Sequence, residues 1–131
     1  MLVSVVIPTF NRLPILKKCL EALETQILID SIDDYEVVIV DDGSTDGTTD
    51  WLKQNFETFP HIRLFEQSHG GPAQARNLGV EKSNGDLIVF IDSDLVVEKY
   101  FLVNHVISLK KAWKKLGNKN CFTYGSVINT S

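Results

Sequence analysis

Short apolar runs recur along the chain and are separated by polar turns. Most of these runs are rich in Val, Ile or Leu and do not alternate apolar with polar residues. Continuous runs of this length are typical of strands that are buried on both faces of a sheet. The runs predict strands at residues 2–7, 35–40, 61–66, 86–91 and 121–128.

Between these runs, apolar residues return at helical spacing or follow helix-start signals. Asn11 is a candidate N-cap for the first helix, Asp46 or Thr48 for the second, and Pro72 suits the first turn of the third. These signals predict helices at residues 13–25, 46–56, 72–82 and 98–116. In the last helix, steps of four and three residues give one apolar stripe of Leu102, Val106, Leu109, Trp113 and Leu116.

Strands and helices therefore alternate, which predicts an α/β protein with a mostly parallel sheet. Continuous apolar strands also indicate that helices cover both faces of the sheet, so we expect a Rossmann-like, three-layer α/β/α arrangement. Its crossovers are expected to be right-handed. The length of 131 residues fits one domain spanning residues 1–131. The sequence contains no apolar run of the ~20 residues that a membrane-spanning helix needs.

Polar segments follow three of the predicted strands, namely Pro8–Arg12, Asp41–Ser44 and Asp92–Asp94. The carboxyl ends of parallel strands share one edge, where ligands bind in open α/β sheets. Two carboxylates at that edge, Asp92 and Asp94, suit Mg²⁺ or Mn²⁺, and these cations suit diphosphates. Taken alone, Asp41–Ser44 is equally typical of a simple turn, because Asp, Gly and Ser are common turn residues.

The net charge of −4 is distributed unevenly along the chain. Residues 1–97 contain 7 Lys or Arg and 16 Asp or Glu, whereas residues 98–119 contain 6 Lys and one Glu. The acidic part argues against nucleic acid as a partner. The basic part has two interpretations, a peripheral contact with an anionic membrane surface or the solvated face of a helix. Cys19 and Cys121 have no metal-binding spacing and fit reduced cysteines of a cytoplasmic protein, at the inner face of the membrane if the basic part binds lipid.

Four segments together resemble the family 2 glycosyltransferases, an inverting group with the GT-A fold. Residues 3–12 are similar to the opening strand and loop of that family, and residues 38–48 are similar to its second motif. Residues 70–79 look like its third motif, and residues 85–94 resemble its metal-binding segment. The four segments occur in order and with normal spacing, which makes the combination far more specific than any one motif.

The resemblance implies transfer of a sugar from a nucleotide-diphosphate donor, a UDP-sugar, to an acceptor hydroxyl with inversion. Mn²⁺ or Mg²⁺ is the implied cofactor, held by Asp92 and Asp94. Thr9 and Asp42 are implied to contact the nucleoside. The acceptor is an unidentified glycan, lipid or protein, and cell-envelope glycan synthesis is the implied setting. The full set of implied nucleotide-binding residues is Pro8, Thr9, Asn11, Arg12, Asp41, Asp42, Gly43, Ser44, Arg76, Asp92 and Ser93.

The roles of one histidine and one arginine each have two interpretations. His69 lies beside Gly70 and either borders the site or is simply exposed. Arg76 either borders the donor pocket or pairs with an acidic residue on the surface.

No catalytic residue is identified, because inverting transfer needs a general base and the family carries it downstream of the metal segment. We expect that base beyond Ser131, so the chain is expected to be the truncated, donor-binding part of a longer catalytic domain. The uncovered sheet edge or apolar patch left by the absent part suggests a homodimer. The main alternative function is a non-catalytic nucleotide-binding or interaction module. A nucleotidyltransferase would need a glycine-rich loop after the first strand, and a phosphoacceptor receiver would need its acidic pair there.

Overall fold

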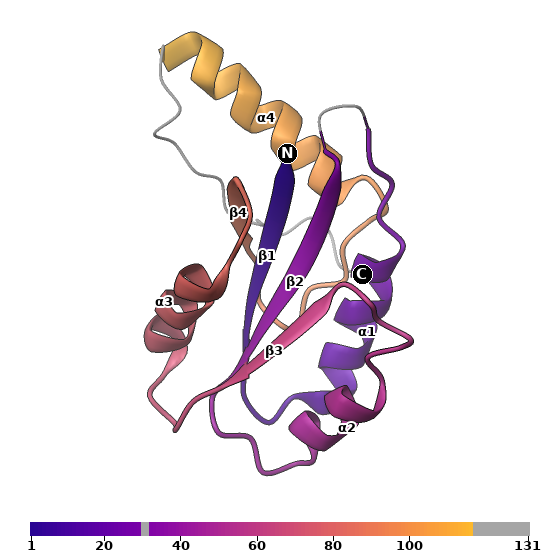
Figure 1. The fold of residues 1–131 in the computed structure, drawn as a ribbon, viewed down its shortest axis with the longest axis vertical. Coiled ribbons are helices and arrows are strands. Elements are labelled where there is room, and N and C mark those ends of the chain that lie inside the picture. The colour runs from indigo at the N-terminus through magenta and orange to yellow at the C-terminus, as the bar shows by residue number, and fades with distance from the viewer. Residues whose placement is uncertain (30–31, 117–131) are drawn as a thin grey trace.

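A parallel four-stranded sheet forms the centre of the molecule (Figure 1). The structure is a computed structural model that describes residues 1–29 and 32–116. Its strands are β1 (Leu2–Thr9), β2 (Asp34–Asp41), β3 (Ile62–Glu66) and β4 (Leu87–Phe90), and they lie in the order β3-β2-β1-β4. The helices are α1 (Leu13–Glu24), α2 (Thr48–Gln54), α3 (Pro72–Lys82) and α4 (Phe101–Leu116). The predicted parallel α/β architecture is confirmed.

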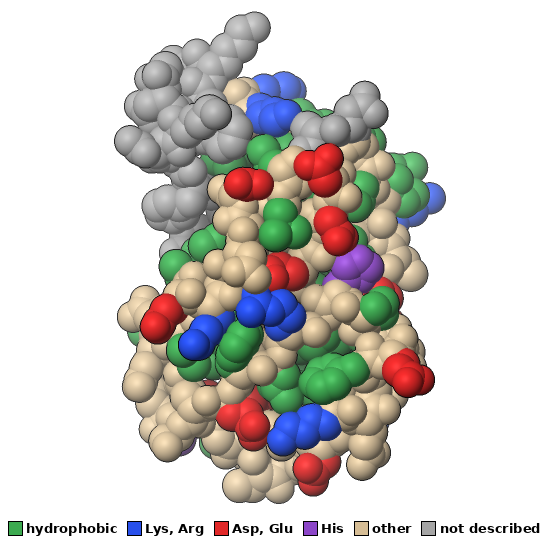
Figure 2. Space-filling model, viewed as in Figure 1, with side chains coloured by type: hydrophobic (Ala, Val, Ile, Leu, Met, Phe, Trp, Pro, Cys, Tyr) green, Lys and Arg blue, Asp and Glu red, His purple; other side chains and the backbone are tan. Residues whose placement is uncertain are grey.

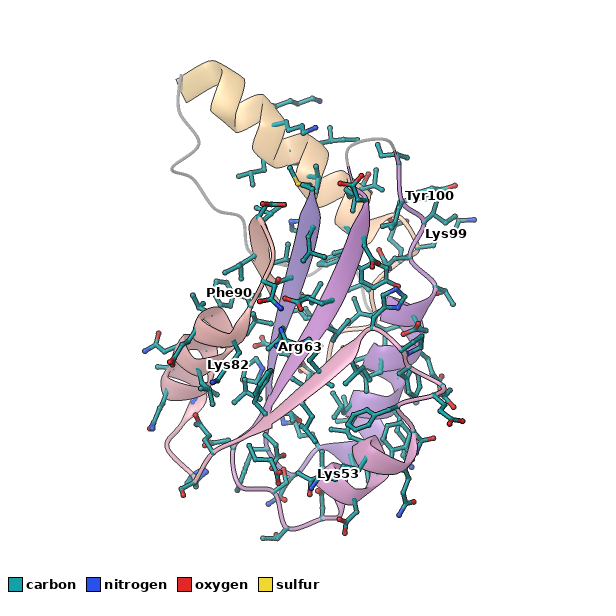
Figure 3. The ribbon with its side chains drawn as sticks, viewed as in Figure 1. Lys53, Arg63, Lys82, Phe90, Lys99 and Tyr100 are labelled. Carbon is teal, nitrogen blue, oxygen red and sulfur yellow. The ribbon has the colours of Figure 1, made fainter. Side chains whose placement is uncertain are left out.

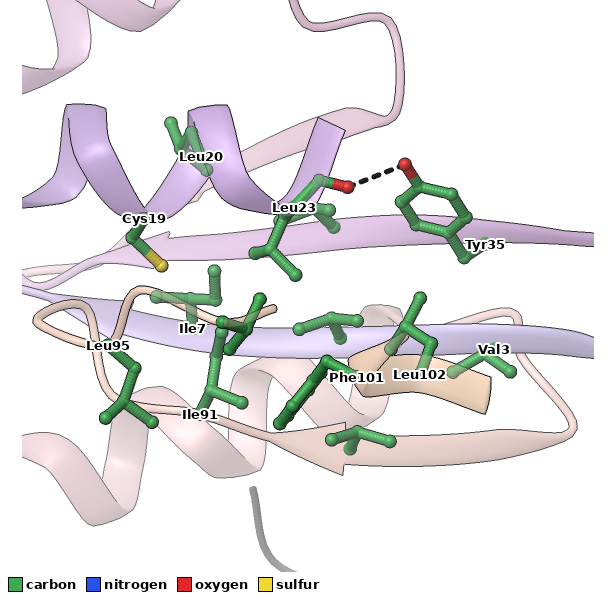
Figure 4. Packing of buried hydrophobic residues seen from close by; sticks show 14 of the residues in the cluster. Val3, Ile7, Cys19, Leu20, Leu23, Tyr35, Ile91, Leu95, Phe101 and Leu102 are labelled. Atoms are coloured by element: carbon green, nitrogen blue, oxygen red, sulfur yellow. Dashed lines mark hydrogen bonds between the residues drawn. The ribbon is translucent and has the colours of Figure 1, made fainter. Parts of the chain in front are cut away.

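Helices cover both faces of the sheet, which gives the predicted three layers. Val3 and Ile7 of β1 pack with the buried side chains of α1 and α4 on one face, as seen in Figure 4. Val6 points the other way and packs with Ala75 of α3, because successive side chains of a strand alternate between faces. Gly79 lets α3 approach closely, since a Cβ at that position would lie 2.3 Å from a methyl carbon of Val6.

A polar network at the amino end of the sheet centres on the buried carboxylate of Glu36 on β2. Glu36 accepts hydrogen bonds from the Ser4 hydroxyl (2.6 Å), the Asn84 amide (2.7 Å) and Arg63 (2.9 Å). Arg63 also donates to the Lys82 carbonyl, and the two basic side chains lie together beside β3 in Figure 3. Elsewhere on this side of the molecule, acidic and basic side chains are interspersed (Figure 2). The turn from α3 into β4 is therefore tied to the two central strands.

The strand β1 continues through Pro8 to Thr9, although the predicted strand ends at residue 7. Val6 accepts a hydrogen bond from Ile91 on the β4 side, and residues two apart in a strand face the same neighbour. Pro8 therefore faces the side where β4 has already ended at Phe90, and its missing N–H breaks no ladder bond. Its register partner on the other side is Val40 of β2.

Several element boundaries differ from the predicted ones. Asn11 is not the N-cap of α1, because Arg12 occupies that position and the Asn11 side chain accepts a hydrogen bond from Thr45 instead. Gly47 occupies the N-cap position of α2, although Asp46 beside it accepts from the Thr48 amide. The last helix begins at Phe101 rather than at residue 98.

In α4 the predicted apolar stripe is buried at Leu102, Val106 and Leu109. Lys110 and Lys111 are exposed, as a solvated helix face requires. The side chains of Trp113 and Leu116 and the predicted strand at 121–128 lie outside the described residues. Within residues 1–29 and 32–116, no helix is long and apolar enough to cross a membrane.

We predict that Glu36→Gln destabilises the fold by about 1–3 kcal/mol, because an amide cannot accept all the hydrogen bonds that this carboxylate accepts. Burial alone would raise the pKa of Glu36, but the bonds from Ser4, Asn84 and Arg63 outweigh it and hold the pKa below 4.5. The stabilisation is therefore complete above the ordinary pKa and is lost as the pH falls through the lower folded-state pKa. Urea unfolding between pH 3 and pH 7 measures both effects.

The exposed Glu21 of α1 provides the matched control, and Glu21→Gln should leave the free energy of unfolding nearly unchanged. Equal losses in the two variants would contradict a special role for Glu36.

Candidate functional site

One pocket of about 410 Å³ lies at the carboxyl edge of the sheet, where the loops after β1, β2 and β4 meet. The residues that line it come from these loops, from the segment before α3 and from the first turns of α3. They are Pro8, Thr9, Phe10, Arg12, Asp42, His69, Pro72, Ala75, Arg76, Asp92, Ser93 and Asp94. Eight of the predicted site residues are thus gathered around one cavity, as the parallel sheet required.

The remaining four predicted residues, Asn11, Asp41, Gly43 and Ser44, do not line this pocket. They brace the loops that form it. The Asn11 amide donates to the Ser44 hydroxyl (2.8 Å), and the Asp41 carboxylate accepts from the Ser44 amide (2.9 Å). Asn11 has a φ of 49°, a left-handed conformation that Asn tolerates better than most residues. Hydrogen bonds therefore join the loop after β1 to the loop after β2.

Asp42 is the most heavily bonded carboxylate in the pocket wall. It is only 4% exposed, and it accepts hydrogen bonds from the Gly70 amide (2.7 Å), the Gly71 amide (3.0 Å) and the Gln67 side chain (2.8 Å). His69 Nδ1 lies 3.0 Å from the same carboxylate. Asp42 thus fixes the loop that leads into α3.

The electrostatics of Asp42 follow from these bonds. Burial alone would raise its pKa, but the hydrogen bonds from Gln67, Gly70 and Gly71, with the nearby His69, outweigh burial and hold the pKa below 3.8. Gly43 permits the close approach, because it has a φ of 86° and a Cβ there would lie 3.2 Å from the backbone nitrogen of His69. The loop is therefore held by an ionised carboxylate throughout the neutral range.

Asp92 and Asp94 are held much more loosely than Asp42. Their side chains are 67% and 50% exposed, and each has one cationic neighbour that also lines the pocket. Arg76 Nη2 lies 3.4 Å from Asp92 Oδ1, and Arg12 Nη1 lies 3.8 Å from Asp94 Oδ2. Arg76 thus lines this pocket and also pairs with an acidic residue.

The two carboxylates of this acidic pair fit a divalent cation whose remaining ligands are water and phosphate oxygens. The described residues contain no group of three or more His, Cys, Asp or Glu arranged to hold a metal ion. Mg²⁺ needs no such group, since it is commonly bound by one or two carboxylates with water and substrate phosphate oxygens completing its shell. Two accessible carboxylates in the pocket supply that partial shell.

Phe10 and His69 form an aromatic pair at the pocket that the sequence signals only in part. Their ring centroids are 4.5 Å apart at an angle of 38°, and the Phe10 side chain is exposed. His69 was expected either to border the site or to be exposed, and it lines the pocket. Phe10 was not predicted, and the sequence signal that points to it is an aromatic residue within the polar segment that follows a strand.

Two buried polar atoms near the pocket lack a hydrogen-bond partner among the described residues. They are the Thr9 hydroxyl oxygen and Asp41 Oδ1, and these two residues are register partners at the ends of β1 and β2. An unpartnered buried polar group costs free energy that a bound water or ligand can recover.

Comparison with known proteins gives a match to one family model, described as glycosyl transferase family 2, over residues 4–116. Among curated proteins, the chain is 35% identical to glycosyltransferase AglE of Haloferax volcanii over 124 residues. That alignment covers 93% of the chain and 40% of AglE.

Two solved structures are similar in both fold and sequence. S. aureus TarS 1-349 in complex with UDP-GlcNAc matches with a TM-score of 0.72 and 27% identity, covering 85% of this chain and 32% of that one. The mannosyltransferase PcManGT from Pyrobaculum calidifontis in complex with GDP-Man and Mn²⁺ matches with a TM-score of 0.70 and 32% identity, covering 79% and 31%. The expected GT-A architecture is confirmed, and the chain spans less than half the length of the relatives and structures named here.

We predict that Asp42→Asn loosens the loop before α3, because an amide presents one acceptor and one donor to two backbone N–H groups. Hydrogen exchange at the Gly70 and Gly71 amides should accelerate about tenfold, as expected for loss of a charge-assisted hydrogen bond. Amide exchange followed by NMR at neutral pH measures this directly.

The exposed Asp50 on α2 is the matched control, and Asp50→Asn should not change exchange at either glycine. Unchanged protection in Asp42→Asn would show that the loop is held by other contacts.

Proposed function

The chain belongs to glycosyl transferase family 2, and we propose that its pocket binds the nucleotide diphosphate of a sugar donor, a UDP-sugar. In the proposed reaction the sugar passes from this donor to an acceptor hydroxyl with inversion. One observation carries the proposal. A single pocket at the carboxyl edge of the sheet brings Thr9, the acidic pair Asp92 and Asp94, and two arginines together.

The nucleoside is proposed to occupy the side of the pocket formed by Thr9, Phe10 and His69. The exposed ring of Phe10 offers an apolar face on which a base can stack, a contact worth about 1–3 kcal/mol. The unpartnered Thr9 hydroxyl provides a hydrogen-bonding group in the same wall. Asp42 contributes by position, since its carboxylate already accepts the amide hydrogens of the loop that carries His69.

The diphosphate is proposed to lie between the acidic pair and the arginines. Asp92 and Asp94 would hold Mn²⁺ or Mg²⁺, which supplies Lewis-acid stabilisation of the charge that develops on the leaving diphosphate. Arg12 and Arg76 orient phosphate oxygens through guanidinium N–H donors. The UDP-GlcNAc of the TarS complex and the Mn²⁺ of the PcManGT complex support a nucleotide-sugar donor and a divalent cation as ligands.

We propose that the residues that bind the acceptor, and the general base that deprotonates its hydroxyl, lie in sequence that this chain does not contain. The greater length of its relatives supports that division. We also propose a cytoplasmic location at the inner face of the membrane, because the exposed Lys110 and Lys111 could contact anionic lipid. We propose a homodimer as well, because β3 lies at an edge of the sheet and could pair with a second chain.

We predict that the 131-residue chain binds UDP in a Mn²⁺-dependent manner and that Asp94→Ala abolishes this dependence. Loss of one of two carboxylates removes half of the protein ligands available to the cation. Calorimetric titration of UDP with and without Mn²⁺ measures the effect, and thermal unfolding checks that the variant keeps its fold.

Asp50→Ala, which removes an exposed carboxylate from α2, should bind UDP like the parent chain. Unchanged metal-dependent affinity in Asp94→Ala would remove Asp94 from the site. Absence of UDP binding by the parent chain would favour the non-catalytic interaction module.

A further inference from the structure

We propose that Arg12 and Arg76 act as resident counter-ions of the acidic pair, and that metal and diphosphate bind by displacing them together. In the free site the guanidinium groups neutralise Asp94 and Asp92. In the loaded site they leave these carboxylates and donate to phosphate oxygens. The inference rests on the proposed function, which it extends by making the metal and nucleotide steps interdependent.

The geometry places one arginine beside each carboxylate, from two different elements. Arg12 occupies the N-cap position of α1, and its Nη1 lies 3.8 Å from Asp94 Oδ2. Arg76 lies on α3, and its Nη2 lies 3.4 Å from Asp92 Oδ1. All four side chains line the same pocket. The acidic pair is thus approached by two independent cations within one cavity.

These two ion pairs are weak and can separate at little cost in free energy. The 3.8 Å separation is too long for a hydrogen bond, and the 3.4 Å contact is weak. The arginine side chains are 53% and 39% exposed, so water can replace each carboxylate at little cost. The buried carboxylates Asp42 and Glu36 differ, because each accepts at least three hydrogen bonds of 3.0 Å or less.

The charge balance explains why displacement must be joint. Two carboxylates and two guanidinium groups are neutral together, so a divalent cation entering alone meets two positive neighbours. A diphosphate entering alone meets two carboxylates. When both enter, the cation takes the carboxylates and the phosphate oxygens take the guanidinium groups. Each ligand therefore raises the affinity of the other by the same factor.

A similar ion pair away from the pocket serves as an internal control. Lys53 Nζ lies 3.6 Å from Glu66 Oε2, and the two side chains are 56% and 53% exposed. Neither residue lines the pocket, and Lys53 lies on α2 (Figure 3). Lys53→Gln thus removes one positive charge of comparable exposure without changing the pocket.

The test compares Mn²⁺ alone with UDP at saturating Mn²⁺, using the full chain and its Arg12→Gln, Arg76→Gln and Lys53→Gln variants. Free Mn²⁺ is followed by electron paramagnetic resonance and UDP by calorimetry. Each arginine variant should bind Mn²⁺ alone roughly tenfold more tightly, since a unit positive charge about 5 Å from a divalent cation in water opposes its binding by about that factor. Each should bind UDP about tenfold more weakly, through loss of a charge-assisted hydrogen bond. Lys53→Gln should change neither affinity.

Tighter Mn²⁺ binding together with weaker UDP binding in the same variant distinguishes counter-ion exchange from a simple phosphate contact. Arg12→Lys and Arg76→Lys keep the charge and should retain the parental affinity for Mn²⁺ alone. Weaker UDP binding with unchanged or weaker Mn²⁺ binding in both glutamine variants would overturn the exchange while leaving the proposed function intact. A parent chain that binds no UDP would overturn the proposed function itself, and the exchange with it.

Discussion

The parallel pairing of β1 with a neighbour on each side is the constraint on which the rest of the molecule depends. Val3, Val5, Val6 and Ile7 are fully buried between helices on both faces, and burying each such side chain contributes about 1.5–3 kcal/mol. A shift of the register by one residue would exchange the two faces of the strand. The same register places the ends of β1, β2 and β4 at one edge. The core therefore decides which loops form the pocket.

Carboxylates in this fold fall into two physical groups. Glu36 and Asp42 are buried, heavily hydrogen-bonded and held at lowered pKa values, and they join elements that are distant in sequence. Asp92 and Asp94 are about half exposed or more, and each has a single distant cation beside it. The carboxylates of the first group accept hydrogen bonds that stabilise the fold. The second group keeps that capacity for a ligand.

Much of this arrangement could be predicted from the sequence because the signals were local. Continuous apolar runs indicated the strands, and polar segments after them indicated the edge at which Thr9, Asp42 and Asp92 meet. Partners across the fold could not be predicted in this way. That Asn11 binds Thr45, or that Asp42 holds two glycine amides, depends on loop geometry that no periodicity encodes. Phe10 lies within the polar segment after the first strand, and its exposure at the pocket could not be predicted from the sequence.

Pro8 lines the pocket, and its effect there comes from its backbone rather than from its side chain. It faces the side on which β4 has ended, and it offers no amide hydrogen that could extend the ladder there. The chain beyond β4 is consequently free to diverge from β1, and the diverging segment carries Asp92, Ser93 and Asp94. The ladder between β1 and β4 thus ends where Pro8 has no amide hydrogen to donate, and Asp92 and Asp94 follow directly after that end and line the pocket.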